Sequence, residues 1–334
     1  MNLAASDRLW GYWHAFDHPV ATWLIVLILG AFAAGLIVVG FLDLSGRIAA
    51  PLRRELWLRI GSWAFLAPTI CLPVLAGSLW TVLAFGVISL WCYREYARAT
   101  GLFREKLVSG FTTLGIILMY LAALDHWYGL FVALIPLVVI ALAIVSIPLD
   151  RPAGYIQRTG LAVFGFLLFG GALAHLAYAA NDPNYRPILL LLLVGVSLND
   201  VLAFVIGKTL GGPKLLPHTS PNKTVSGSLG ALIVTIGVVA IVAEPIFVGT
   251  RLEPLTHRLG LGLLVGALGQ LGDLMVSSIK RDIGIKDMGI TIPGHGGVLD
   301  RFNSLLLVAP AAFHYIGYFK GFGLDQPTRI FSGG

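Results

Sequence analysis

The chain has 334 residues, of which 57% are hydrophobic and 12% are charged, and its mean hydropathy is +0.85. Because soluble domains carry about 25% charged residues, this composition excludes a single water-soluble globule and predicts an all-α polytopic integral membrane protein. The formal charge of +6 comes from bases scattered between apolar runs, which argues against nucleic-acid binding and favours basic loops at a membrane surface. The two cysteines, Cys71 and Cys92, both lie in apolar segments, so a disulfide framework or a zinc ribbon is excluded.

Apolar runs between charges and turn residues predict ten membrane-spanning helices. In chain order they cover residues 20–42, 62–76, 79–92, 111–124, 128–147, 160–180, 187–206, 227–249, 258–279 and 303–320. The second and third spans are short, and the break at Gly77 and Ser78 predicts a hairpin turn between them. A single long, tilted helix over residues 62–92 is the alternative.

The distribution of Lys and Arg predicts the orientation, because cytoplasmic loops hold an excess of these residues. Of the 23 Lys and Arg residues, 17 lie in alternate loops. Those loops are 43–61, 93–110, 148–159, 207–226 and 280–302. They are therefore expected to face the cytoplasm, and both termini are expected to face away from it.

The loop 207–226 combines glycines, lysines and hydroxyl side chains. Its amides, hydroxyls and ammonium groups could cradle a polyphosphate. It is not a Walker loop, because Leu202 stands where the first glycine of that motif would be. A basic loop lying on anionic lipid headgroups is an equally compatible interpretation.

Two carboxylates, Asp200 and Asp273, lie inside predicted spans. A carboxylate there costs at least about 2.5 kcal/mol unless it is paired or hydrated, so both are candidate functional residues. Helical spacing also places Gln270, Ser277 and Lys280 on the same face as Asp273. The alternative is that each aspartate merely pairs with a Lys or Arg of a neighbouring helix.

The loop 280–302 holds a histidine among glycines, His295, between two groups of charged residues. Glycines allow the backbone to approach a ligand closely. Asp273 and Asp300, separated by basic residues, match the needs of a divalent cation that carries a triphosphate. Alternatively, Asp300 caps the last span and His295 is a hydrogen-bonded loop residue.

These motifs resemble the integral-membrane phosphatidate cytidylyltransferases, also called CDP-diacylglycerol synthases. The signature of that family reads here Ser277-Ser278-Ile279-Lys280-Arg281, Lys286-Asp287, Gly289, Ile292-Pro293, His295-Gly296-Gly297 and Asp300-Arg301-Phe302. The similarity extends to Ser220-Pro221-Asn222-Lys223-Thr224 with Gly227, to Asp200 with Gly207, and more loosely to Arg94-Glu95-Tyr96 with Gly101. It covers about residues 59–320, so residues 1–58 are expected to form an extra N-terminal transmembrane anchor with a basic loop. Residues 59–334 are then the cytidylyltransferase-like membrane domain.

The resemblance implies the reaction of CTP with phosphatidate to give CDP-diacylglycerol and pyrophosphate. It implies magnesium, with room for a second cation, at the cytoplasmic face of what is expected to be a bacterial inner membrane. By position it implies Asp273 and Asp300 as metal ligands. The implied catalytic residues are Lys223, Lys280, Arg281, His295 and Asp300, and the implied substrate-binding residues are Asp200, Ser220, Thr224, Lys286, Asp287 and Arg301. A homodimer is compatible with the sequence.

Three acids of the family pattern are absent, because Ser226, Val276 and Asn303 stand in their places. This leaves other functions open. They are a cytidylyltransferase or CTP-dependent kinase for another lipid, such as an isoprenoid phosphate, and a catalytically inactive paralogue that binds lipid or CTP. A transporter with an ion path through His175, His314 and Asp200 is a further alternative, which the lack of inverted repeats disfavours.

Overall fold

The computed structural model of the chain describes residues 3–46, 50–292, 296–322 and 329–332. In the N-terminal half, the helices are α1 (Leu3–Trp10), α2 (Pro19–Leu44), α3 (Ala50–Ala76), α4 (Ser78–Ala99), α5 (Lys106–Asp125) and α6 (Tyr128–Val145). In the C-terminal half they are α7 (Tyr155–Gly165), α8 (Leu173–Ala179), α9 (Tyr185–Leu210), α10 (Val225–Ala243), α11 (Leu255–Asp282), α12 (Leu299–Phe302) and α13 (Leu305–Lys320). A π-helical segment, Phe166–Ala172, joins α7 to α8.

Eight helices among the described residues are long and apolar enough to cross a membrane. The protein is therefore an all-α polytopic membrane protein, as the composition predicts. These eight segments are Pro19–Leu44, Leu52–Ala76, Lys106–Asp125, Tyr128–Leu149, Tyr155–Ala179, Tyr185–Leu210, Val225–Ala243 and Leu255–Asp282. Helix α13 is a shorter apolar helix, and α4 is not among the eight, so the count of ten spans remains a prediction.

The break between α3 and α4 is the predicted hairpin turn rather than part of one long helix. Gly77 separates the two helices with φ of +140°, a backbone conformation that favours glycine. A Cβ atom at this position would lie 2.4 Å from the carbonyl oxygen of Leu9, so the turn also packs closely against α1.

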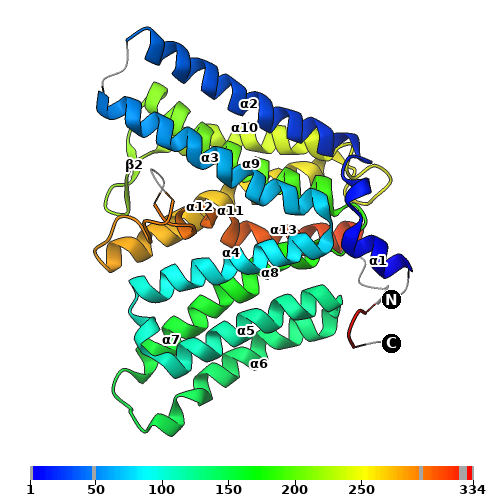
Figure 1. The fold of residues 1–334 in the computed structure, drawn as a ribbon. Coiled ribbons are helices and arrows are strands. Elements are labelled where there is room, and N and C mark those ends of the chain that lie inside the picture. Colours follow the sequence, from blue (N-terminus) through cyan, green and yellow to red (C-terminus); the bar gives the residue numbers. More distant parts are fainter. Residues whose placement is uncertain (1–2, 47–49, 293–295, 323–328, 333–334) are drawn as a thin grey trace.

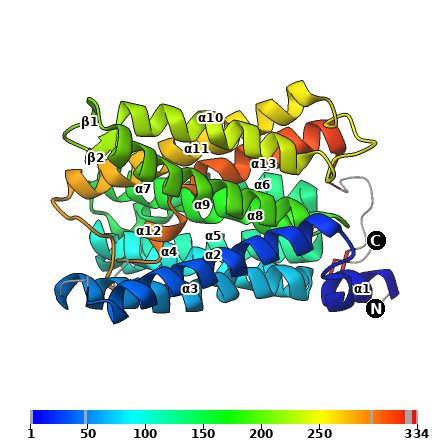
Figure 2. The same ribbon diagram turned by 90° about the horizontal axis from the view of Figure 1, so that it is seen from above.

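The helices run side by side, with α1 and the described C-terminal segment at one end of the bundle (Figures 1 and 2). The carboxylate of Asp125 holds that segment, because its Oδ1 accepts hydrogen bonds from the amides of Ile330 and Phe331 at 2.8 and 2.6 Å. The connections that carry most of the Lys and Arg residues lie at the opposite end (Figure 1).

The loop after α9 contains an antiparallel hairpin that hydropathy did not predict. Strand β1 (Lys214–Leu216) pairs with β2 (Ser220–Thr224), with Lys214 opposite Thr224. The hydroxyl of Thr224 accepts a 3.1 Å hydrogen bond from the amide of Gly227 and so caps α10. The hairpin therefore ends where α10 begins, so Lys223 lies two residues before the first residue of that helix.

Candidate active site

Three segments that are distant in sequence meet at the bundle end opposite the termini: the β1–β2 hairpin, the C-terminal end of α11, and the residues before and within α12 (Figure 1). A close approach of backbones holds two of them together. A Cβ atom on Gly272 of α11 would lie 2.6 Å from the carbonyl oxygen of Asn303, so only glycine fits there without displacement. Asp273 is thereby placed beside the segment that follows α12.

Asp273 is the centre of the first charged group. Its Oδ2 lies 2.6 Å from Nζ of Lys223, and its Oδ1 accepts a 2.5 Å hydrogen bond from Nδ2 of Asn303. The side chains of Lys223 and Asp273 keep 21% and 24% of their surface exposed. The pairing of Asp273 with a lysine, foreseen as the alternative, is thus present, and both side chains are partly exposed although Nζ of Lys223 is buried.

Asp200 of α9 joins the same group through Ser304. The Ser304 hydroxyl lies 3.1 Å from Asp200 Oδ2, and the Ser304 amide donates a 2.8 Å hydrogen bond to Oδ1 of Asn303. Asp200 is exposed and makes no ion pair within 4.0 Å with a Lys or Arg of the described residues. Asp200 and Asp273 therefore flank one short segment, Asn303 and Ser304, with Asp200 exposed and Asp273 partly exposed.

Lys280 and Asp300 form a second, buried ion pair, with 2.7 Å between Nζ and Oδ1. The other oxygen, Oδ2, accepts hydrogen bonds from the amides of Met288 and Gly297 at 2.9 and 3.0 Å. Both oxygens of Asp300 are thus occupied by protein donors. This carboxylate folds the loop 288–300 against the end of α11, in addition to any role toward a ligand.

Glu95 of α4 anchors the same loop, a role that the loose sequence match around it did not reveal. Its Oε1 accepts hydrogen bonds from the Val298 amide at 3.0 Å and the Thr291 hydroxyl at 2.8 Å, and its Oε2 accepts one from the Leu299 amide at 2.9 Å. The side chain is buried. It satisfies amides at the start of α12 that would otherwise have no intrahelical partner.

Two glycines of the signature are required by this carboxylate. A Cβ atom on Gly297 would lie 2.4 Å from Glu95 Oε2, and one on Gly289 would lie 2.7 Å from Glu95 Oε1. The glycines therefore leave space for the Glu95 carboxylate to pack against the backbone of the loop. This packing role is additional to the close approach of a ligand that the sequence suggested.

Arg281 connects the two loops. Its Nε lies 3.3 Å from the carbonyl oxygen of Thr219, and its Nη1 donates a 3.1 Å hydrogen bond to the carbonyl oxygen of Ile285. These bonds hold the hairpin against the end of α11. The exposed remainder of the guanidinium stays accessible.

Arg301 lies near the carboxylates and keeps an exposed edge. Burial of the rest of its side chain lowers the pKa of the guanidinium, and the charges of Asp300, Asp200 and Asp273 oppose that shift. Among the other predicted residues, Ser220 and Thr224 lie on β2, and Lys286 and Asp287 lie exposed on the loop. His295 lies outside the described residues.

Gln270 supports the site from within the bundle. Its Nε2 donates to Asn199 Oδ1 at 3.2 Å and to the Ser228 carbonyl oxygen at 3.0 Å, and the Thr235 hydroxyl also donates to Asn199 Oδ1 at 3.2 Å. This polar network links α9, α10 and α11 one helical turn from Asp200 and Asp273. It keeps the helices that carry the two aspartates in register.

The donor set fits magnesium that arrives with a nucleotide. The described residues contain no group of three or more His, Cys, Asp or Glu that could hold a metal ion by itself. Magnesium in proteins usually binds one or two carboxylates together with substrate phosphates and water. The exposed carboxylate of Asp200 meets that requirement directly, and Asp273 meets it on releasing Lys223 or Asn303. Asp300 is less suited, because it is only 3% exposed and protein donors contact both of its oxygens.

Residues 57–319 match the family model described as Cytidylyltransferase family. A protein of Escherichia coli strain K12, named Uncharacterized protein YnbB, is 34% identical over 274 residues, which cover 79% of this chain and 88% of that protein. Two proteins named Phosphatidate cytidylyltransferase are also similar. The one from Bacillus subtilis strain 168 is 42% identical over 36% of this chain and 44% of its own length, and the one from Staphylococcus aureus strain COL is 38% identical over 44% of this chain and 52% of its own length. The chain thus spans about half the length of these two relatives.

Proposed function

The chain belongs to the cytidylyltransferase family, and from this premise we propose that it transfers CMP from CTP to the phosphate of a membrane lipid. The first candidate acceptor is phosphatidate, with CDP-diacylglycerol and pyrophosphate as products. The observation that carries the proposal is the convergence of Lys223, Asp273, Lys280 and Asp300 at one end of the bundle, where a charged nucleotide and a lipid headgroup can meet. The names of the relatives from Bacillus subtilis and Staphylococcus aureus support the choice of acceptor.

In the proposed reaction, an oxygen of the lipid phosphate forms a bond to the α-phosphorus of CTP. The bond from that phosphorus to the oxygen bridging the β-phosphate breaks, and pyrophosphate leaves with the electron pair. Both reactants are anions, so the protein must position them and neutralise their charge. Lys223 and Arg301 are the cations that we assign to the phosphate oxygens, because Arg301 is exposed near Asp273 and Lys223 contacts Asp273 through its Nζ.

We assign magnesium to Asp273 and Asp200. The family resemblance implies Asp273 with Asp300 instead, but Asp300 is buried in its pair with Lys280. When bound, the cation would offset the charge of the triphosphate. Asp273 and Asp200 would hold the cation, and Lys223, next to Asp273, would bind phosphate oxygens. Lys280 would keep its contact with Asp300 and so preserve the folded loop.

The proposed active face is the cytoplasmic one. The bundle end that carries this site also carries most Lys and Arg residues, and such loops remain in the cytoplasm. The family and these charges together support a bacterial inner membrane. CTP is supplied on that side of the membrane.

A different lipid phosphate is the second candidate acceptor. The supporting observation is Asn303, whose amide donates to Asp273 where the family pattern has an acid. This exchange alters the charge beside Asp273 and could change how the acceptor phosphate is held. An isoprenoid phosphate is one acceptor of this kind, and a CTP-dependent lipid kinase or an inactive paralogue are the related alternatives.

The test uses purified protein in detergent with magnesium and CTP labelled at either the α- or the γ-phosphate. Phosphatidate and a polyprenyl phosphate are supplied in separate reactions. Label passing from the α-position into lipid, with release of pyrophosphate, supports cytidylyl transfer, whereas label passing from the γ-position indicates a kinase. Asp273→Asn should abolish the product, and the matched variant Asp282→Asn, at an exposed carboxylate of the same helix, should not. Absence of lipid product from folded, CTP-binding protein would overturn the proposal.

A further inference from the structure

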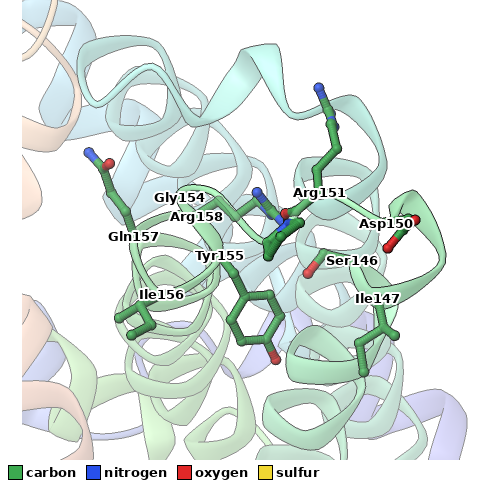
Figure 3. A pocket seen from close by; sticks show the side chains of 10 residues that line it. Ser146, Ile147, Asp150, Arg151, Gly154, Tyr155, Ile156, Gln157 and Arg158 are labelled. Carbon is green, nitrogen blue, oxygen red and sulfur yellow. The ribbon is translucent and has the colours of Figure 1, made fainter.

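A cavity lies at the junction of α6 and α7, and Figure 3 shows the residues that line it. Its volume is about 780 Å³, and it is lined by ten residues between Ser146 and Arg158. None of these residues belongs to the cytidylyltransferase motifs. The cavity therefore needs an explanation of its own.

Two buried donors of this cavity lack a protein partner. Within the described part of the chain, the Ser146 hydroxyl and the Arg158 Nε make no hydrogen bond, although their residues are only 1% and 8% exposed. The two Nη groups of Arg158 do have partners, the carbonyl oxygens of Ala153 and Arg151. A buried donor without an acceptor costs about 1–3 kcal/mol, so a ligand with acceptor oxygens would stabilise this arrangement.

The start of α7 adds further donors. The helix begins at Tyr155 in the cavity wall, its N-cap Gly154 provides no side-chain acceptor, and its first turn contains no acidic residue. The first amides of a helix have no intrahelical partner and attract anions. The Tyr155 amide already donates to the Pro152 carbonyl oxygen, so the contribution comes from the amides of Ile156 and Gln157. The lining also contains the guanidinium of Arg151, which is 62% exposed and lies 3.3 Å from the Glu105 carboxylate, a residue outside the lining. The unpartnered donors of Ser146 and Arg158, together with these amides, therefore favour a ligand with acceptor oxygens, such as a phosphate group.

The position of the cavity indicates which class of molecule supplies these acceptor oxygens. The cavity joins the ends of two membrane-spanning segments, Tyr128–Leu149 and Tyr155–Ala179, at the end of the bundle rich in Lys and Arg. Ile147 and Ile156 in its wall are 61% and 85% exposed, which is expected of apolar side chains that face lipid. We propose that this cavity binds the phosphate group of an anionic phospholipid, with the acyl chains lying along α6 and α7.

The test measures lipid binding and not catalysis, so it is independent of the proposed function. The full chain in detergent is titrated with dioctanoyl phosphatidylglycerol, with dioctanoyl phosphatidylcholine and with inorganic phosphate, and bound molecules are counted by native mass spectrometry. Saturable binding of phosphatidylglycerol, stronger than binding of phosphatidylcholine, is expected. Ser146→Ala should weaken it about tenfold, which is the effect of losing one hydrogen bond to a charged group, and Arg158→Gln should weaken it further.

Arg98→Gln, which removes an exposed arginine at the end of α4, is the matched control and should leave binding unchanged. If Arg158→Gln does not fold, Ser146→Ala and Arg151→Gln still test the proposal, because neither removes a bond from a buried side chain. Equal phosphatidylglycerol binding by the native chain and by these variants would overturn the proposal. Binding of inorganic phosphate without binding of phosphatidylglycerol would overturn the lipid assignment.

Discussion

The amide of Leu299 donates a 2.9 Å hydrogen bond to Oε2 of Glu95, across 204 positions of the sequence. This bond attaches the signature loop and α12 to a helix of the N-terminal half. The second oxygen of Glu95 holds the Val298 amide and the Thr291 hydroxyl of the same loop. The geometry of the candidate active site thus depends on a carboxylate that faces the loop and not the ligand.

Replacing Glu95 with Gln should impair activity while the protein still inserts and folds. The amide retains one acceptor oxygen, but its NH2 group would face an amide donor of the loop. We expect a loss of about 1–3 kcal/mol in folding free energy and roughly a hundredfold loss of activity, because displacing reactive groups by about 1 Å has that effect. Formation of CDP-lipid and hydrogen exchange of residues 288–299 measure the two effects. Glu244→Gln, at a carboxylate that is 63% exposed, is the control. Unchanged exchange in Glu95→Gln would contradict the anchoring role.

Apolar runs and turn residues predicted the long apolar helices of this fold, and they also predicted the turn at Gly77. They failed at the ends of helices, since α3 begins at Ala50, 12 residues before the predicted span. The residues Arg53, Arg54 and Glu55 are good helix formers that a hydropathy criterion places outside the membrane. An apolar run therefore marks the membrane-buried part of a helix and not its full length.

The motif residues of the site were predictable, but their partners were not. The sequence indicated Asp273 and Asp300 as equivalent ligands. In the structure protein donors contact both oxygens of each carboxylate, but the Asp273 side chain is 24% exposed and that of Asp300 only 3%. The amide donors of Met288 and Gly297 depend on the path of the loop, which side-chain chemistry does not encode. For the same reason the link between Asp200 and Ser304 had no signal in the sequence.

Breaking the buried pair of Lys280 and Asp300 from one side should be strongly destabilising. Lys280→Met leaves the Asp300 carboxylate buried without a counter-charge, and such a change costs about 3–5 kcal/mol. The double variant Lys280→Met with Asp300→Asn should cost less than the sum of the two single changes, because neither charge remains. The free energies of unfolding in detergent of the native chain, the two single variants and the double variant give the coupling between Lys280 and Asp300. Arg59→Met, which breaks an exposed pair with Glu55, should cost at most about 1 kcal/mol. Additive effects at Lys280 and Asp300 would show that the pair does not couple.

Restoring the family acid at position 303 should make stability depend on magnesium. Asn303 donates to Asp273 at 2.5 Å, so Asn303→Asp replaces a donor with a second negative charge. In EDTA the carboxylates repel, and Tm should fall. Added magnesium should raise Tm of the variant more than that of the native chain, because a ligand that binds the folded state stabilises it. Asn184→Asp, at an exposed position at the opposite end of the bundle, should not respond to magnesium. An equal rise of Tm with magnesium in Asn303→Asp and in Asn184→Asp would exclude a cation at Asp273.

Placing a methyl group on Gly297 should displace the loop from Glu95. The new Cβ atom would lie 2.4 Å from Glu95 Oε2 and 2.8 Å from the Gly289 amide nitrogen, so carboxylate and loop cannot both keep their positions. Overpacking of this kind costs about 1–3 kcal/mol, and activity should fall with it. Gly237→Ala in α10, where nothing lies within 4 Å, should instead be neutral or stabilise the helix by up to about 1 kcal/mol.

A compensating change separates this steric effect from a general defect of the loop. Glu95→Asp shortens the carboxylate by one methylene and makes room for the methyl group on residue 297. The combined variant Gly297→Ala with Glu95→Asp should therefore be more stable than the two single effects predict, with a coupling of at least about 0.5 kcal/mol, as expected for residues in direct contact. The free energies of unfolding of the native chain, the two single variants and the combined variant in detergent give this coupling. A coupling of zero would mean that Gly297 is required for another reason, such as the backbone conformation next to Gly296, whose φ is +81°.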